Sequence, residues 1–225
     1  MRKSAIFLLF VAFCLTILGL SAQGGIAVSP QTARPKTEAE GKQKPEDSKQ
    51  RPVAKSKVYL LHSDLLRKDA THPDAQIVTG NVRFRHDSVY MYCDSACYYD
   101  KVSSFEAFGN VKMVQGDTLF LYGDRLYYDG LTQIAEMRCN VRMENRTTTL
   151  LTDSLNYDRV YNLGYFFDGG TLMDEQNVLT SEWGEYSPQT KQSVFNYNVK
   201  LVNPQFTLTS DTLRYNTASK VADIV

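Results

Sequence analysis

The chain has 225 residues, 43% of them hydrophobic and 12% aromatic, which is enough to bury a core and too much for a disordered chain. Its 25 basic and 25 acidic residues balance to a net charge of zero, so it lacks the basic excess typical of nucleic-acid binding. Fourteen tyrosines beside one tryptophan, with few helix-favouring runs, favour a sheet protein.

The first 22 residues have the organisation of a cleavable export signal. Arg2 and Lys3 form a short positive segment, an uncharged and mostly apolar stretch runs from Ala5 to Leu20, and Ser21 and Ala22 supply small residues for cleavage. The rival interpretation is a membrane anchor, but a spanning helix needs about 20 apolar residues and this stretch is shorter. We therefore expect residues 1–22 to be a signal peptide and the mature chain to be exported.

Residues 23–57 are predicted to form a disordered polar linker. They contain four prolines, many Lys, Glu and Gln residues, and almost no large apolar side chain. Such a segment cannot bury enough surface to offset the entropy lost on ordering. Its eight basic and four acidic residues give it a charge of +4, which would attract it weakly to an anionic membrane surface, although a plain solvated spacer is the simpler interpretation.

From Val58 onward, a short motif recurs in steps of 29, 30, 30 and 28 residues. It has the form Gly-Asn-Val-basic-apolar, and some copies depart from it. The copies are Gly80–Phe84, Gly109–Met113, Cys139–Met143, the weaker Gly169–Met173, and Tyr197–Leu201.

A second motif follows each copy by about 14 residues, and it consists of an acidic residue followed by x-Leu-x-Tyr or a close variant. Its copies begin at Asp94, Asp124, Asp153, Glu182 and Asp211, and an incomplete first copy begins at Asp64. Six copies in register indicate a repeat architecture that spans residues 58–225. By this register the last strand is unfinished at Val225, which suggests an incomplete domain or an edge that pairs with another chain.

Alternation within each repeat predicts strands with one buried face. Val82 and Phe84 point to one side and Arg83 and Arg85 to the other, and we expect every copy to do the same. The apolar positions change parity after each acidic residue, which predicts a bulge or bend there, and the Gly-Asn step suits a second corner. The predicted fold is all-β: an elongated open β-jelly roll, or two-sheet sandwich, built from about six repeats of 29–30 residues.

Residues typical of catalysis or metal binding are not arranged in any recognisable pattern. The three histidines lack ligand spacing, and no phosphate-binding loop or nucleophile elbow is present, so we expect no enzyme, no cofactor and no metal site. The recurrent acidic residues are better explained as corners, because they occur once per repeat. Cys93, Cys97 and Cys139 are compatible with small free residues in strands or with one disulfide that involves Cys139.

The alternating apolar residues allow two interpretations, a packed core or an open groove for acyl chains, and the residues alone favour the core. The opposite face carries a column of basic residues, which we expect to be a solvated outer surface. This column is Arg83, Lys112, Arg142 and Lys200.

Together, the two motifs and the signal peptide resemble the OstA-like (organic solvent tolerance) family, which includes periplasmic lipopolysaccharide-transport bridge proteins. The resemblance covers residues 58–225 and implies an open jelly roll whose apolar groove shields lipopolysaccharide acyl chains on the way to the outer membrane. The groove-lining candidates are Val82, Phe84, Val89, Met91, Val111, Met113, Leu119, Leu121, Val141, Met143, Leu150 and Leu208.

The resemblance also implies a location and partners. The protein is expected in the periplasm, free or associated with the outer membrane, with lipopolysaccharide or a related glycolipid as its ligand. Other envelope transport proteins, or a second copy, would add to its edge strand. The alternative function is a structural or assembly scaffold of the envelope that carries no lipid.

Overall fold

The structure is a computed structural model that describes residues 56–69 and 72–225. The expected signal peptide, and all of the expected linker except Ser56 and Lys57, lie outside the described residues. Both of these residues contact the β-domain: the Ser56 hydroxyl lies 2.7 Å from His86 Nε2, and Lys57 Nζ lies 2.6 Å from a carboxylate oxygen of Asp100.

The described part of the chain is almost entirely β-strand, which confirms the predicted all-β class. Its elements are β1 (Tyr59–His62), β2 (Leu65–Asp69), β3 (His72–His86), β4 (Val89–Tyr99), a 3-10 turn η1 (Asp100–Val102), β5 (Ser104–Gln115), β6 (Leu119–Asp129), β7 (Ile134–Asn145), β8 (Thr148–Asp158), β9 (Leu163–Phe166), β10 (Gly170–Asp174), β11 (Asn177–Ser181), β12 (Trp183–Tyr186), β13 (Gln192–Asn203), β14 (Phe206–Asn216) and β15 (Val221–Ile224).

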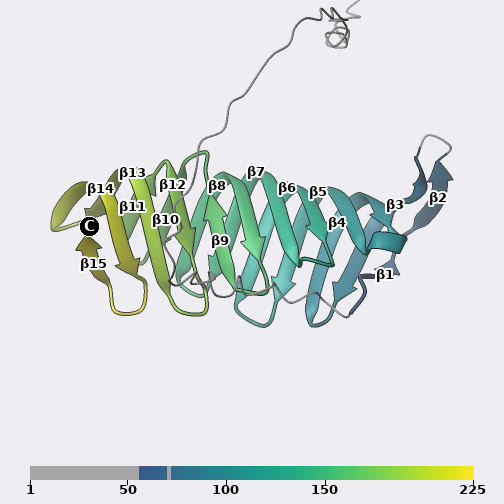
Figure 1. Ribbon diagram of the computed structural model, residues 1–225, viewed down its shortest axis with the longest axis horizontal. Helices are drawn as coiled ribbons and strands as arrows, with labels where there is room; N and C mark the ends of the chain where they lie inside the picture. Colours follow the sequence, from purple (N-terminus) through teal and green to yellow (C-terminus); the bar gives the residue numbers. More distant parts are fainter. Residues whose placement is uncertain (1–55, 70–71) are drawn as a thin grey trace, which may run out of the picture. The chain divides into compact units, whose positions relative to one another are not determined.

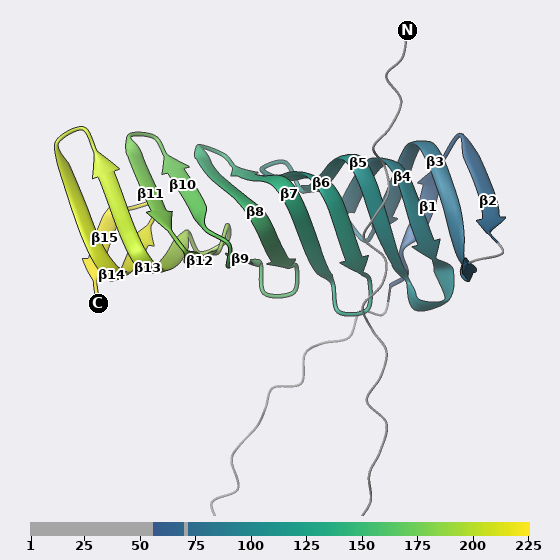
Figure 2. The same ribbon diagram turned by 90° about the horizontal axis from the view of Figure 1, so that it is seen from above.

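The strands belong to one hydrogen-bonded antiparallel sheet, and they follow one another along the long axis of the β-domain (Figures 1 and 2). The long strands are bent, so the sheet folds lengthwise into two layers that face each other. The first layer comprises β1 and residues 82–93, 111–123, 141–152, 170–181 and 199–210, and the other strand segments, β2 and β15 among them, form the second layer. Phe84 of the first layer stacks on Phe105 of the second, with ring centroids 4.1 Å apart.

The bends fall at the two recurring motifs, and we call the line that they form the crease. Between β3 and β4 the pairing register slips from Thr79 to Val82, which is the predicted bulge. The two residues in this gap, Gly80 and Asn81, have φ angles of +78° and +48°. Glycine and asparagine tolerate this left-handed conformation best, which explains why the Gly-Asn pair recurs.

Side-chain hydrogen bonds between neighbouring strands hold the crease. The amide of Asn110 donates to a carboxylate oxygen of Asp94 at 2.8 Å, and Asn140 donates to Asp124 at 2.5 Å. The amide of Asn198 makes the same bond to Glu182 at 2.5 Å. The recurrent acidic residues therefore occupy the corner role that their spacing predicted.

The weak copy of the motif at Gly169 differs from the expected alternation. Its two long strands are divided into the separate pairs β9 with β12 and β10 with β11. Only Gly169 adopts a positive φ here, so this corner has one left-handed residue where the others have two. The following side chains therefore turn over: Leu172 is fully buried and Met173 faces outward, which makes our prediction of an inward position for Met173 wrong.

Candidate functional site: the apolar interior and its polar seam

A continuous row of apolar side chains runs along the inner face of the first layer. Each member is the cross-strand partner of the next, from β3 at one end of the domain to β14 at the other. The row is Phe84, Met91, Met113, Leu121, Met143, Leu150, Leu172, Leu179, Leu201 and Leu208. At the usual spacing of strands, ten members extend over roughly 43 Å. Polar residues do not interrupt this row.

Every predicted lining residue lies on the inner face of the first layer. Phe84, Met91, Met113, Leu121, Met143, Leu150 and Leu208 belong to the apolar row, Val82, Val111 and Val141 lie beside the crease, and Val89 and Leu119 lie at the far edge. All except the partly buried Leu208 are between 0% and 4% exposed and belong to one packed core cluster. The interior of this structure is thus a filled apolar space.

Aromatic side chains of the second layer cover the apolar row. Along its inner face, tyrosines from the Asp-x-Leu-x-Tyr motif alternate with small residues on the intervening strands from β7 onward, whereas Phe105 of β5 lies between Tyr98 and Tyr128. Tyr128, for example, is paired with Ala135, Tyr157 with Gly164 and Tyr186 with Ser193. The small residues leave room for the rings of Tyr128, Tyr157 and Tyr186.

The tyrosine hydroxyls reach the edge opposite the crease, where turns of the two layers meet along a line that we call the seam. The Tyr128 hydroxyl lies 2.7 Å from His86 Nδ1, and the Tyr215 hydroxyl donates to Asp174 at 2.8 Å. Between them, Gln115 donates to the Asn162 side chain at 2.9 Å. Side-chain hydrogen bonds therefore close the seam at successive levels along the domain.

Burial shifts the ionisation of the seam. The His86 side chain is fully buried, and this burial, together with the nearby Arg159 guanidinium, lowers the pKa of its imidazole. Burial also raises the pKa of the Tyr128 phenol to about 12. Both groups are therefore uncharged at neutral pH, which suits an imidazole and a phenol that share one hydrogen bond.

Several polar atoms at the seam are buried without a hydrogen-bond partner among the described residues. They include Gln115 Oε1, Arg159 Nε and the Tyr186 hydroxyl. Buried polar atoms are nearly always paired in folded proteins, so such atoms indicate places where water or a polar ligand group completes the network.

The seam was not predicted from the sequence, although a signal for it exists. At the inward position nearest each first-layer turn the residue is polar, and this position recurs every 29 or 30 residues. These residues are His86, Gln115, Asn145, Asp174 and Asn203. Inward polar residues at the period of a repeat predict a polar edge to an apolar interior.

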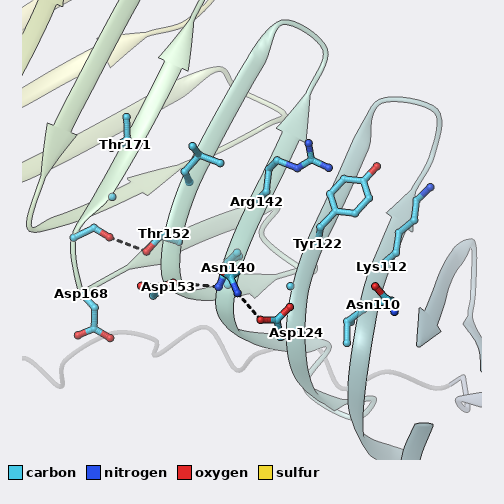
Figure 3. A pocket seen from close by; sticks show the side chains of 16 residues that line it. Asn110, Lys112, Tyr122, Asp124, Asn140, Arg142, Thr152, Asp153, Asp168 and Thr171 are labelled. Carbon is cyan, nitrogen blue, oxygen red and sulfur yellow. Dashed lines mark hydrogen bonds between the residues drawn. The ribbon is translucent and has the colours of Figure 1, made fainter. Parts of the chain in front are cut away.

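The basic column lies on the outside of the first layer, as predicted, and single tyrosines separate its first three members, Arg83, Lys112 and Arg142. Lys112, Tyr122 and Arg142 are cross-strand neighbours, and the Arg142 guanidinium lies 4.4 Å from the centroid of the Tyr122 ring. An open hollow of about 850 Å³ lies between this column and the crease (Figure 3). Asp124, Asp153 and Asp168 also line the hollow, so it mixes both signs of charge.

The remaining sequence expectations concern metals, cysteines and membrane spans. Within the described residues, no cluster of His, Cys, Asp or Glu has an arrangement that could hold a metal ion. Cys93, Cys97 and Cys139 form no disulfide within the described residues, and burial raises the pKa of Cys93 to about 12. In residues 56–69 and 72–225, no helix is long and apolar enough to cross a membrane.

The fold and its interior define an elongated β-jelly roll built by repetition around a continuous apolar track. The sequence profile of the OstA-like protein family matches residues 55–211, and the chain belongs to this family. A solved structure with local similarity is LptH of Pseudomonas aeruginosa, described as the LptA-homologous periplasmic component of a lipopolysaccharide transport device. It shares 12% identity, with 47% of this chain and 80% of that chain covered and a TM-score of 0.44. Among curated proteins, none matches this chain.

Proposed function

We propose that this protein is a non-enzymatic periplasmic lipid carrier that shields the acyl chains of lipopolysaccharide, or a related glycolipid, on the way to the outer membrane. Membership of the OstA-like family supports this proposal. Other envelope transport proteins, or a second copy of the chain, are the proposed partners, and they would pair with an exposed edge strand.

The observation that carries the proposal is the unbroken apolar row from Phe84 to Leu208. A core needs only enough apolar area to be stable, whereas a path for an acyl chain must be apolar at every step. Each methylene that leaves water for such a path contributes about 0.8 kcal/mol. Three members of the row are methionines, whose flexible side chains adapt to ligands of irregular shape.

Because the interior is filled, lipid needs space that this conformation does not offer. In our proposal the two layers separate at the seam and rotate about the crease. The seam is held by side-chain hydrogen bonds, which a polar headgroup or water can replace, whereas the crease is continuous backbone. The acyl chains then occupy the interior, and the headgroup stays at the seam in contact with water.

Photocrosslinking tests this arrangement. A photoreactive amino acid replaces Leu121, on the interior row, or Arg142, on the outer face of an adjacent strand, and the purified full chain is exposed to lipopolysaccharide. We expect crosslinks from position 121 and none from position 142. Circular dichroism of each variant checks that it is folded.

The scaffold alternative is favoured by the near-complete burial of the interior residues, which resembles an ordinary core. It predicts that a folded variant with the probe at position 121 captures no lipid. Absence of crosslinks at both positions from folded protein would therefore refute lipid carriage and leave the scaffold function.

A further inference from the structure

The middle of the seam differs in charge from its other levels. At four levels, the first-layer turn has a tip residue with a positive φ: Asp87, Gly116, Arg146 and Glu175. Acidic or neutral residues occupy three of these tips, and only Arg146 is basic. The facing second-layer turn carries Lys191, whose Nζ donates to the side-chain oxygen of Asn145 at 2.5 Å, next to Arg146 in the chain.

Carboxylates compensate the cations elsewhere along the seam. Lys220 lies 2.5 Å from Asp174 and 3.5 Å from Glu175, and Arg159 lies 3.9 Å from Asp87. Within the described part of the chain, no carboxylate lies at ion-pair distance from Arg146 or Lys191. Burial lowers the pKa of Lys191, and the charge of Arg146 lowers it further, so these two cations repel each other without compensation.

A buried phenol, Tyr186, lies near this level. Tyr186 is 1% exposed, and burial raises the pKa of its phenol, while the neighbouring Thr217 and Thr148 side chains lower it. Thr148 is the cross-strand neighbour of Asn145, which accepts the bond from Lys191. Two uncompensated cations thus lie at one level of the seam, and both are hydrogen-bond donors to an anion.

We propose that Arg146 and Lys191 form an anion site at the seam, which takes the phosphate of an amphiphile whose acyl chains lie between the two layers. This inference rests on the proposed function, because the amphiphile must enter through the seam. Arg146 and Lys191 come from opposite layers, so a bound phosphate bridges the layers while the seam is open. Hydrogen bonds between charged partners are the strong ones, and a phosphate accepts several at once.

The test compares ligands that share one chain and differ in headgroup. The affinity of the full chain is measured for dodecyl phosphate, for a neutral dodecyl ether of ethylene glycol, and for inorganic phosphate, each below its micelle concentration. We expect dodecyl phosphate to bind at least about tenfold more tightly than the neutral ether, and inorganic phosphate to bind more weakly than dodecyl phosphate.

Charge variants assign this preference to the site. Arg146→Gln with Lys191→Gln should remove most of the preference for the phosphate headgroup and leave affinity for the neutral ether unchanged. The matched control is Arg83→Gln with Lys200→Gln, which removes the same charge from the exposed outer face and should keep the preference. The seam variant should melt no earlier than wild type, because it relieves repulsion and the introduced glutamine amide keeps a donor for Asn145. If the double variant is unstable, Arg146→Gln alone, which changes an exposed side chain, should reduce the preference for dodecyl phosphate over the neutral ether.

Each other result would overturn the assignment in a distinct way. Equal binding of the two amphiphiles would refute the anion site and leave the proposed function intact. Binding of neither would refute the proposed function itself. Inorganic phosphate that binds as tightly as dodecyl phosphate would indicate a site for free phosphate, and loss of the preference in the outer-face variant would indicate a non-specific charge effect.

Discussion

The crease and the seam are the two long edges of one folded sheet, and they are held in different ways. At the crease, nearly every repeat uses the same bond, an asparagine amide that donates to the acidic residue of the neighbouring strand. At the seam, each level uses different side chains, such as His86 with Tyr128 and Asp174 with Lys220. Identical bonds along the crease indicate a structural role, and varied bonds along the seam indicate local roles.

Burial separates the two edges further. The Asn–Asp pairs of the crease are exposed, whereas His86 and Asp174 at the seam are fully buried. An exposed hydrogen bond contributes little, and a broken buried one is costly because it leaves an unpaired polar group. Substitutions that leave a buried polar group of the seam unpaired should therefore change stability more than crease substitutions.

The largest effect is expected for Lys220→Ala. This change leaves the buried Asp174 carboxylate with only the Tyr215 hydroxyl as a strong partner. Because Lys220 is about one third exposed, we expect a loss of roughly 2–3 kcal/mol in the free energy of unfolding, below the roughly 3–5 kcal/mol typical of fully buried pairs. Denaturant unfolding measures it, with Lys200→Ala on the outer face as the control. Equal stability of the two variants would show that the seam pair contributes nothing.

A smaller effect is expected at the crease. Asn110→Ala removes the bond to Asp94 and places alanine at a φ of +47°, so we expect a loss of about 1 kcal/mol. Asn110→Gly loses the same bond and keeps the left-handed conformation accessible. The difference between the two variants in denaturant unfolding measures the backbone part of the loss. An alanine variant as stable as wild type would contradict the structural role of the crease.

A gain in stability is expected where a crease corner departs from glycine. Cys139 has a φ of +64° at the position that Gly80 and Gly109 occupy in earlier repeats. Cys139→Gly should raise the free energy of unfolding by about 0.5–1 kcal/mol, because glycine adopts this conformation without strain. Cys139→Ala, measured alongside it, should give no gain. A destabilised glycine variant would mean that the cysteine side chain itself supports the corner.

The smallest effect concerns a single titrating group, His86. Its pKa in the folded chain lies below the ordinary value of 6.5, so the unfolded chain binds more protons between these two values. The stability contributed by neutral His86 is therefore complete above pH 6.5 and is lost as the pH falls through this window. Thermal melts from pH 8 to pH 5 should show a steeper decline for wild type than for His86→Gln. Melting temperatures that decline equally with pH in wild type and in His86→Gln would contradict the buried, neutral state of His86.

The fold was predictable from the sequence because each crease element lies within one short motif. The Gly-Asn pair predicts a left-handed corner. An acidic residue about 16 positions earlier is the residue to which the asparagine amide donates. The same reasoning failed at Gly169, where the loss of one left-handed residue turned the next side chains over. The alternation is counted from the motif, and at this corner the left-handed stretch is one residue shorter than at the others.

The seam was harder to predict because its partners are far apart and chemically unlike. Tyr128 and His86 are 42 residues apart, and Asp174 and Lys220 are 46 residues apart. Each tyrosine follows the repeat, but its partner is a histidine at one level and an aspartate at another. Only the folded sheet brings these residues together, so the repeat could predict the position of the seam and not its chemistry.

The most direct test of lipid carriage measures whether the seam opens. Spin labels at Thr147 and Thr190 occupy exposed turns of opposite layers, and labels at Thr147 and Gln176 occupy two turns of the first layer. Electron paramagnetic resonance distances are recorded with and without lipopolysaccharide. The account predicts a longer distance between positions 147 and 190 when lipid is bound and an unchanged distance between positions 147 and 176. Lipid binding with both distances unchanged would contradict it.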